Sequence, residues 1–255
     1  MIVAETVALY AISCLLASGQ ALSREKEEER QEILDLVFVV QSVPSRAELR
    51  QRLLEYIPPA IVVEDVGPPP PSPWAGYQLC LRRFLETGVS HACILQDDVV
   101  VCRNFVAAVV RITEVQPDVP VCLFVSGRRS HTLKYYRRAA AAKQAYSKIW
   151  FQDFLPVVAV LWPRVKVEEF LDWAKDAKLP GMPNPRSDDA VAGSWMKFTK
   201  QTVLATVPSL VEHPDDTPSV KWSVDSRVPS GHKNKRNRAC WFIGDDDPLE
   251  LDWSV

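Results

Sequence analysis

The residues in this chain best suited to chemistry are two pairs of adjacent carboxylates and one late histidine. The pairs are Asp97-Asp98 and Asp188-Asp189, and the histidine is His213. Carboxylate oxygens favour a hard divalent cation such as magnesium or manganese over zinc, and a positioned carboxylate or imidazole can serve as a general base. The pattern therefore suits a site with one divalent cation and one base.

Each of these features also has a simpler structural explanation. Asp97-Asp98 can be an ordinary turn, because Asp is common where a strand gives way to a loop. Asp188-Asp189 can be first-turn acids behind a Ser187 cap, where the helix dipole favours negative charge. His213, which precedes Pro214, can be a loop histidine. From the residues alone, both explanations stay open.

Several catalytic classes lack their fingerprints in this sequence. The nine glycines form neither the GxGxxG of a dinucleotide-binding fold nor a phosphate-binding P-loop, and no GxSxG nucleophile motif occurs. With 255 residues, 47% hydrophobic and 24% charged, the chain can bury the core of one large domain. Its net charge of -2 is nearly balanced, so the question of a polyanionic partner rests on local patches.

The cysteines and the N-terminus bear on location. The cysteines show no CxxC pair or metal-finger spacing, which predicts reduced thiols in a cytoplasmic protein. They are Cys14, Cys80, Cys93, Cys102, Cys122 and Cys240. The apolar run at residues 7–17 is too short to span a membrane and lacks the basic residues that precede a signal-peptide core. We expect residues 1–33 to form a helical extension beside a main domain of residues 34–255.

The hydrophobic pattern predicts the elements that position these residues. Short apolar runs indicate strands at residues 36–40, 60–63, 91–96, 121–125, 155–162 and 202–207. Helices are expected between them, the first opening with a capping box from Ser45 to Glu48. The predicted inward faces are Leu49, Leu53 and Tyr56, then Trp74, Tyr77, Leu81 and Phe84, then Val191, Trp195 and Phe198. This alternation predicts an α/β fold with a mostly parallel sheet, helices on both faces, and ligands at the carboxyl ends of the strands.

A series of short motifs carries a resemblance to a known family. The motifs are VQSVPSR at 40–46, WAGY at 74–77, LQDDV at 95–99, SDD at 187–189, PSLVEH at 208–213, RACWFIG at 238–244 and LDW at 251–253. In their order and spacing the chain resembles a GT-A-type glycosyltransferase, and more narrowly a group found in bacteriophages and actinobacteria. The resemblance covers residues 36–255 and implies a Rossmann-like GT-A domain.

The resemblance implies metal-dependent transfer of a sugar from a nucleotide donor, by implication UDP-linked. Asp98 would ligate Mn²⁺ or Mg²⁺, His213 would be a further ligand, and Asp97 would orient the ribose or a water on the metal. Such a cation stabilises the charge that develops on the departing diphosphate. Gln96 stands where the family's DxD motif more usually has an acid. The lost negative charge predicts weaker metal binding that depends more on the nucleotide.

Nucleotide recognition is expected at the ends of the first two strands. The resemblance implies contacts from Val43, Ser45, Arg46 and Asp65, and from Gln96 and Asp97 at the DxD position. Arg46 has the alternative of being a solvated helix residue. Trp74 and Tyr77 are candidates for the donor pocket, although their spacing is more typical of the buried face of a helix.

The acceptor hydroxyl requires a base, because a hydroxyl is a weak nucleophile until its proton is taken. Asp189 is the first candidate for this base and Asp188 the second. A loop with three prolines at residues 180–185 leads into the pair, and a loop of that length usually shapes a site.

A basic segment bears on the acceptor. Residues 119–152 contain no Asp or Glu but carry several cations around Tyr135, Tyr136 and Tyr146, and a second basic patch spans residues 232–238. The candidate acceptor contacts are Arg128, Arg129, Lys134, Arg137, Arg138, Lys233, Lys235 and Arg236. Clustered cations with aromatic residues between them are typical of nucleic-acid binders. The simpler alternatives are a solvated helix face or residues that bind a diphosphate.

Three hypotheses follow for the function. The first is a cytoplasmic, phage-type enzyme that glycosylates a hydroxymethylated pyrimidine in DNA, with no membrane partner; the base would be flipped out or the strand opened. The second keeps the site but uses a glycan or a protein as acceptor. The third is a non-catalytic nucleic-acid-binding module in which the acidic pairs are incidental. The sugar, the stereochemistry and the oligomeric state do not follow from the sequence.

Overall fold

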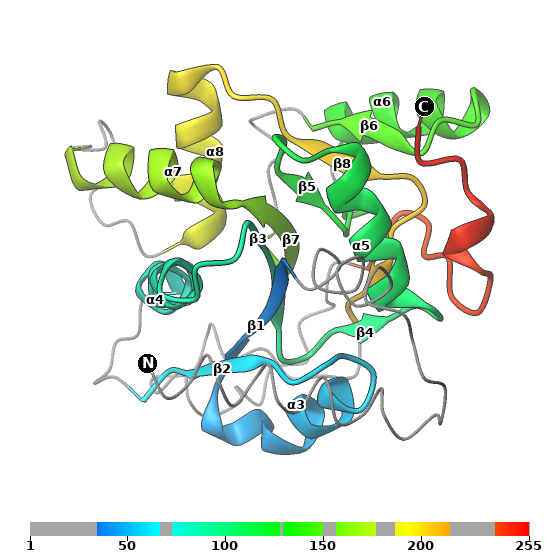
Figure 1. Ribbon diagram of the computed structural model, residues 1–255. Coiled ribbons are helices and arrows are strands. Elements are labelled where there is room, and N and C mark those ends of the chain that lie inside the picture. The colour runs from blue at the N-terminus through cyan, green and yellow to red at the C-terminus, as the bar shows by residue number, and fades with distance from the viewer. Residues whose placement is uncertain are drawn as a thin grey trace, which may run out of the picture.

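A seven-stranded mixed sheet forms the centre of the computed structural model (Figure 1). The structure describes residues 35–66, 73–127, 130–149, 157–176, 187–214 and 238–254. The strands lie in the order β2-β1-β3-β7-β5-β8-β6. Their bounds are β1 (Leu36–Ser42), β2 (Ile61–Glu64), β3 (His91–Gln96), β5 (Val121–Cys122), β6 (Tyr146–Lys148), β7 (Ala159–Pro163) and β8 (Leu204–Thr206).

Most strands of this sheet point the same way. β1 pairs in parallel with β2 and β3, and β5 pairs in parallel with β8. β7 lies between β3 and β5 and is antiparallel to both, and β6 is antiparallel to β8. Thus β1, β2, β3, β5 and β8 share one direction, while β6 and β7 run against it. The predicted α/β fold with a mostly parallel sheet is confirmed.

Successive side chains of the central strands enter two hydrophobic cores, one on each face of the sheet. Val37 and Val39 of β1 belong to one core, and Phe38 and Val40 to the other. The first core contains residues of α4 (Pro73–Leu85), α6 (Ser130–Ala141), α7 (Arg164–Asp176) and α8 (Asp188–Thr199), and the second those of α3 (Ala47–Leu54) and α5 (Phe105–Val115). Helices therefore cover both faces, as predicted.

The first predicted helix differs from the observed one. A 3₁₀ turn, Pro44–Arg46, precedes α3, and no side chain caps the start of α3, so the predicted capping box is wrong. The helix ends at Leu54, and Tyr56 is 68% exposed instead of buried. Phe198, in the last turn of α8 past the buried Trp195, is 54% exposed, which is also contrary to prediction.

A second, two-stranded sheet matters for the site. It pairs β4 (Val100–Val101) with β9 (Val211–Glu212) in antiparallel fashion. The strand predicted at 121–125 is regular only over its first two residues, Val121 and Cys122. Beyond them, the Leu123 carbonyl accepts hydrogen bonds from the N–H groups of Leu210 and Val211. A short 3₁₀ helix, η3 (Pro248–Glu250), lies near the end of the chain.

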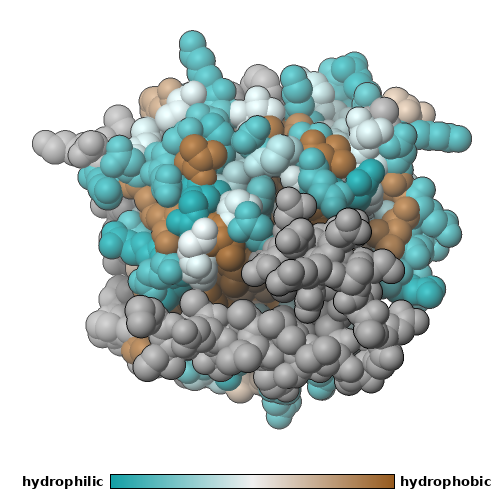
Figure 2. All heavy atoms as spheres, in the orientation of Figure 1, coloured by the Kyte–Doolittle hydropathy of each residue, from teal (hydrophilic) through white to brown (hydrophobic). Residues whose placement is uncertain are grey.

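Several predictions lie outside the described residues: the extension at 1–33, the three-proline loop at 180–185, and residues 128–129 and 232–237 of the basic patches. In the described ranges no helix is long and apolar enough to cross a membrane. The described cysteines are free thiols, as predicted. On the face shown in Figure 2, the described surface is largely hydrophilic, with smaller hydrophobic patches.

Candidate functional site

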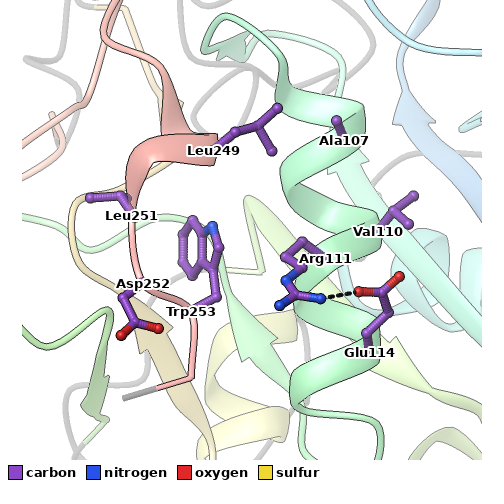
Figure 3. Close-up of a pocket in the computed structure, with 8 residues that line it drawn as sticks. All are labelled: Ala107, Val110, Arg111, Glu114, Leu249, Leu251, Asp252 and Trp253. Atoms are coloured by element: carbon purple, nitrogen blue, oxygen red, sulfur yellow. Dashed lines mark hydrogen bonds and ion pairs between the residues drawn. The ribbon is translucent and has the colours of Figure 1, made fainter.

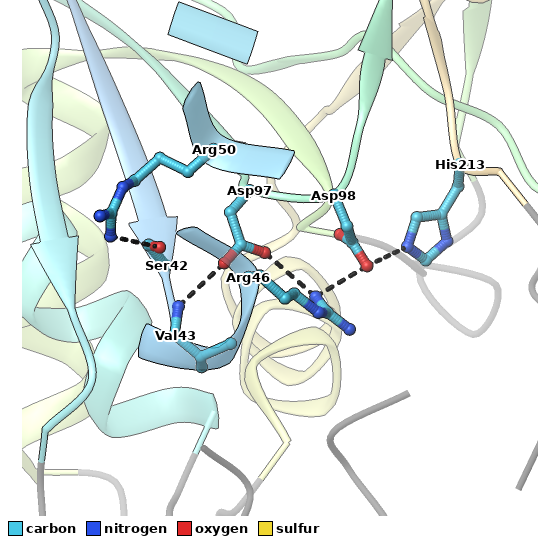
Figure 4. Close-up of polar contacts among 7 residues, drawn as sticks. All are labelled: Ser42, Val43, Arg46, Arg50, Asp97, Asp98 and His213. Carbon is cyan, nitrogen blue, oxygen red and sulfur yellow. Dashed lines mark hydrogen bonds and ion pairs between the residues drawn. The ribbon is translucent and has the colours of Figure 1, made fainter. Parts of the chain in front are cut away.

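A buried arginine lies between the first two carboxylates (Figure 4). The Arg46 Nη1 atom is 3.0 Å from Oδ1 of Asp97 and 2.7 Å from Oδ2 of Asp98. The side chains of Arg46, Asp97 and Asp98 are only 7%, 3% and 0% exposed. Arg46 is therefore a buried cation that binds both acids, and the alternative of a solvated helix residue is wrong.

The sheet brings these three residues together. β1 and β3 are adjacent parallel strands with Gln41 opposite Gln96, so the chain leaves both strands at the same edge. Asp97 donates its N–H to the Gln41 carbonyl at 3.0 Å, and its Oδ2 accepts the Val43 N–H at 2.8 Å. The 3₁₀ turn that follows β1 then returns Arg46 over that edge. The expected clustering at the carboxyl ends of the strands is the arrangement observed.

His213 joins this group from the far end of the chain. β9 pairs with β4, which closely follows Asp98, and this pairing places the Nε2 atom of His213 3.1 Å from Oδ2 of Asp98. The two residues are 115 positions apart in sequence, and both are buried. We refer to Arg46, Asp97, Asp98 and His213 as the Arg46 cluster.

The cluster concentrates charge where water is scarce. Burial, and next the neighbouring Asp98, raise the pKa of Asp97, while Arg46 and the Val43 N–H lower it. With both acids ionised, the pair carries one more negative charge than the guanidinium of Arg46 neutralises. The cluster is thus an environment that attracts a further cation.

The donor set fits a divalent cation that shares its coordination with a ligand. The adjacent Asp98 Oδ2 and His213 Nε2 atoms provide one oxygen and one nitrogen donor. Among the described residues no group of three or more His, Cys, Asp or Glu side chains is arranged to hold a metal ion. Magnesium in nucleotide enzymes commonly takes one or two protein ligands and completes its shell with phosphate oxygens and water. Asp98 and His213 fit that kind of site.

Glu212, which the sequence did not single out, supports His213 from the preceding position. Its buried carboxylate accepts the N–H groups of His213 and Ala239, each at 2.8 Å, and its Oε2 lies 3.3 Å from Nη2 of Arg238. It thus ties β9 to the C-terminal segment. Its place inside the PSLVEH motif was the only sequence signal.

Arg50 is a second residue that the sequence did not reveal. Its Nη1 atom donates to the Ser42 hydroxyl at 3.1 Å and forms an ion pair with Glu64. The contact joins the ends of β1 and β2 beside the cluster (Figure 4). Arg50 lies four residues after Arg46. This spacing could point to the site only once the orientation of α3 is known.

The second acidic pair begins α8 as predicted. Asp188 accepts the N–H of Asp189 at 2.9 Å, and Asp189 accepts that of Ala190 at 2.9 Å. Ser187 occupies the N-cap position, as expected, but its side chain makes no capping hydrogen bond there. Asp188 is buried, whereas Asp189 is more accessible.

The aromatic candidates for the donor pocket lie in the core. Tyr77 is fully buried, and its hydroxyl accepts a hydrogen bond from Nε1 of Trp162 at 2.7 Å. Trp74 packs against Phe170, with ring centroids 5.4 Å apart. Burial, and to a lesser degree the charge of Asp188, raise the pKa of Tyr77. The placement of both aromatics matches the core interpretation, and it sets Asp188 near α4.

The remaining nucleotide-site candidates follow the strand ends. Ser45 is exposed on the 3₁₀ turn, and Asp65 is partly buried and donates its N–H to the Ser42 carbonyl at 2.9 Å. Gln96 ends β3 and is partly buried. These residues and the Arg46 cluster, apart from His213, follow the ends of β1, β2 and β3 at the same edge of the sheet.

The helix α6 lies within the basic segment at residues 119–152. Lys134, Arg137 and Arg138 are exposed along this helix, as is Tyr135. Tyr136 instead points into the protein, where its hydroxyl donates to the Trp241 carbonyl at 3.2 Å. The candidates Arg128, Arg129, Lys233, Lys235 and Arg236 lie outside the described residues. The described part is therefore a cationic helix face with one exposed aromatic ring.

A cavity of about 360 Å³ lies elsewhere, between α5 and the C-terminal segment (Figure 3). Arg111 and Glu114 form an ion pair on its α5 side, and Trp253 faces them. None of its lining residues belongs to the predicted site. The charge arrangement at the strand ends, and not this cavity, identifies the candidate site.

Fold and site together define an α/β protein with a buried acidic cluster at the carboxyl edge of its sheet. No protein-family model matches the chain, and no curated protein matches it. The chain is similar to a solved structure of A197 from STIV, with a TM-score of 0.41 and 18% identity over 71% of this chain and 85% of that one. So distant a likeness carries no argument about function.

Proposed function

We propose that the protein is a metal-dependent glycosyltransferase that moves a sugar from a nucleotide-sugar donor, by the resemblance UDP-linked, to an acceptor hydroxyl. The observation that carries the proposal is the Arg46 cluster, two buried carboxylates with a guanidinium and an imidazole at the carboxyl edge of an α/β sheet. This edge is where such sheets bind nucleotides. The motifs that resemble GT-A glycosyltransferases contribute every member of the cluster.

Each residue of the site has a role that follows from its chemistry. Asp98 and His213 would hold Mn²⁺ or Mg²⁺, which when bound stabilises the negative charge of the departing nucleoside diphosphate. Val43 and Arg46 fix the carboxylate of Asp97 on both of its oxygens, so that Asp97 presents a defined geometry to the ribose side of the donor. Ser45, Asp65 and Gln96 line the same edge.

Asp189 is the base that we propose for the acceptor. It is the more accessible member of its pair and lies in the first turn of α8. There its carboxylate would accept the proton of the acceptor hydroxyl as the bond to the sugar forms. Asp188, which is buried near Tyr77, is the reserve candidate.

A hydroxymethylated pyrimidine in DNA is the acceptor that we favour. The exposed cations of α6 would attract the phosphate backbone, and Tyr135 offers an exposed ring for stacking. A base in a duplex would have to be flipped out to reach the site. The free thiols of the described cysteines support a cytoplasmic location. A glycan or protein acceptor is the alternative.

The deciding experiment offers a panel of sugar nucleotides with Mn²⁺ and hydroxymethylated DNA, followed by mass spectrometry of the nucleosides. We expect a mass increase of one hexose or similar sugar on the modified pyrimidine, absent with Asp98→Ala. Donor hydrolysis with no DNA product would point to a glycan or protein acceptor. Salt-sensitive DNA binding without release of nucleoside diphosphate from any donor would refute catalysis and favour a binding module.

The acceptor surface can be tested separately. The double variant Arg137→Glu, Arg138→Glu should weaken DNA binding by about tenfold or more and reduce its salt dependence, since each lost phosphate contact lowers the slope by about one. Donor hydrolysis should stay unchanged. The matched control is Arg82→Glu, Arg83→Glu, which reverses two exposed arginines on α4. Equal losses in both double variants would show only a general charge effect.

A further inference from the structure

The position of Arg46 raises a question that the metal assignment alone does not answer. Its Nη1 atom lies 2.7 Å from Oδ2 of Asp98, the same oxygen that His213 approaches at 3.1 Å. A divalent cation binds carboxylate oxygens at about 2.0–2.6 Å. A metal ion on this oxygen would lie against the guanidinium, and two cations in so dry a place repel strongly. Close approach of both cations to Oδ2 of Asp98 is therefore electrostatically unfavourable.

We propose that Arg46 and the divalent cation compete for Asp98, an inference that rests on the proposed function. In the ligand-free protein Arg46 pairs with both buried carboxylates and offsets part of their negative charge. When the metal binds Asp98, the guanidinium leaves that oxygen and becomes available to the diphosphate of the donor. Arg46 is thus a built-in counter-ion of the acidic pair and a phosphate-binding residue of the same site.

The local structure permits this exchange. Arg46 ends the short 3₁₀ turn, and its backbone N–H is fixed by the Val43 carbonyl at 3.0 Å. The long side chain can turn about its own bonds without moving β1. The planar guanidinium matches two oxygens of a phosphate as well as it matches a carboxylate. Asp97 keeps the Val43 N–H as a partner when Arg46 turns.

The competition also explains why metal binding would depend on the nucleotide. A metal ion that binds alone must displace Arg46 from Asp98, one of its two acidic partners. A donor diphosphate supplies the displaced guanidinium with new oxygens, so metal and diphosphate assist one another. The missing third acid at Gln96 acts in the same direction, because it leaves the bare site with fewer negative charges.

The test measures Mn²⁺ binding to the ligand-free full chain by electron paramagnetic resonance of the free ion. Arg46→Met removes the competing cation and should tighten Mn²⁺ binding by about tenfold or more relative to the unmodified protein. Arg50→Met is the matched control, because it removes a neighbouring positive charge that does not touch Asp98. We expect Arg50→Met to change the affinity less than twofold. Adding Asp98→Asn to Arg46→Met should abolish the gain.

Three results would overturn the inference: equal Mn²⁺ affinity in Arg46→Met and the unmodified protein, an equal gain in Arg50→Met, or a gain that survives Asp98→Asn. The inference would also be overturned if no variant bound Mn²⁺. If Arg46→Met does not fold, the unmodified protein provides the test. Mn²⁺ should then raise the rate at which phenylglyoxal labels Arg46 several-fold, read by peptide mass spectrometry, with Arg50 unchanged. An unchanged Arg46 rate would refute the exchange.

Failure of this inference can be told apart from failure of the proposed function, since neither measurement uses a donor or an acceptor. Sugar transfer without competition would leave the enzyme assignment standing and remove only the role of Arg46. If Arg46 and Mn²⁺ compete for Asp98 but no sugar is transferred to any acceptor, the site would be a metal-dependent binding site and the enzyme assignment would be wrong.

Discussion

The two acidic pairs of this protein are held in different ways. The Arg46 cluster joins side chains from three separate parts of the chain, and its carboxylates are bound by a buried cation and an imidazole. The pair that begins α8 accepts hydrogen bonds from the backbone of its own helix. The first arrangement therefore depends on the tertiary fold, and the second mainly on local structure.

This difference separates two uses of a carboxylate. A carboxylate at the start of a helix is stabilised by backbone N–H groups and by the helix dipole, and it adds modestly to the stability of the protein. A carboxylate buried beside a second one costs desolvation and repulsion, which the protein offsets with Arg46. This cost is one reason why we propose that the buried pair binds a ligand.

The largest expected effect comes from breaking the buried cluster. Asp98→Ala leaves Arg46 and His213 without their shared partner, and removing one member of a buried pair typically costs about 3–5 kcal/mol of stability. Urea unfolding monitored by circular dichroism measures the loss. Asp189→Ala, at the partly exposed start of α8, should cost about 1 kcal/mol or less. Similar costs for both variants would remove the distinction between the two pairs.

A second test concerns chemistry at the α8 pair. If Asp189 is the base, Asp189→Asn should slow sugar transfer by about 10²-fold or more. Nucleotide-sugar binding, measured by calorimetry, should stay nearly the same, because Asn retains the shape and the acceptor oxygen. Unchanged transfer in Asp189→Asn, together with a large loss in Asp188→Asn, would move the base to the buried residue.

The smallest effect concerns the cap of α8. Ser187 makes no capping hydrogen bond through its side chain, so Ser187→Ala should change the free energy of unfolding by less than about 0.5 kcal/mol. Asp188→Ala removes an acceptor of a first-turn N–H and should cost about 1 kcal/mol. Thermal denaturation of both variants checks the order, and a larger cost for Ser187→Ala would restore serine as the cap.

Much of the fold could be predicted because local patterns repeat. The apolar runs at β1 and β3 and the inward residues of α4 follow from burial on both faces of the sheet. Helix ends were harder. Tyr56 and Phe198 fit the helical period of the predicted faces, but the helix stops before Tyr56, and Phe198 lies past the buried part of α8. Periodicity gives the face of a helix and not the extent of the core beneath it.

The site was predicted by residue type but not by its contacts. Asp97 and Asp98 stand out because a buried strand ends at them, and His213 because of the motif around it. The contact of Arg46 with both acids could not be predicted, since it depends on a 3₁₀ turn where the sequence favours a capping box. Glu212 left no sequence signal beyond its place in the PSLVEH motif, because its partners include a backbone group 27 residues away.

The two-residue ladder between β4 and β9 makes completion of the site depend on a long-range contact. β1 and β3 are near neighbours in the chain, so Arg46 and the two acids can meet early. His213 arrives only when a contact spanning 115 residues closes, and contacts of such long range form slowly. The acidic pair and Arg46 can therefore come together before the imidazole reaches them. Because Arg46 carries one positive charge against two carboxylates, this partial cluster stays negatively charged when both acids are ionised, until β9 pairs with β4 and brings in His213.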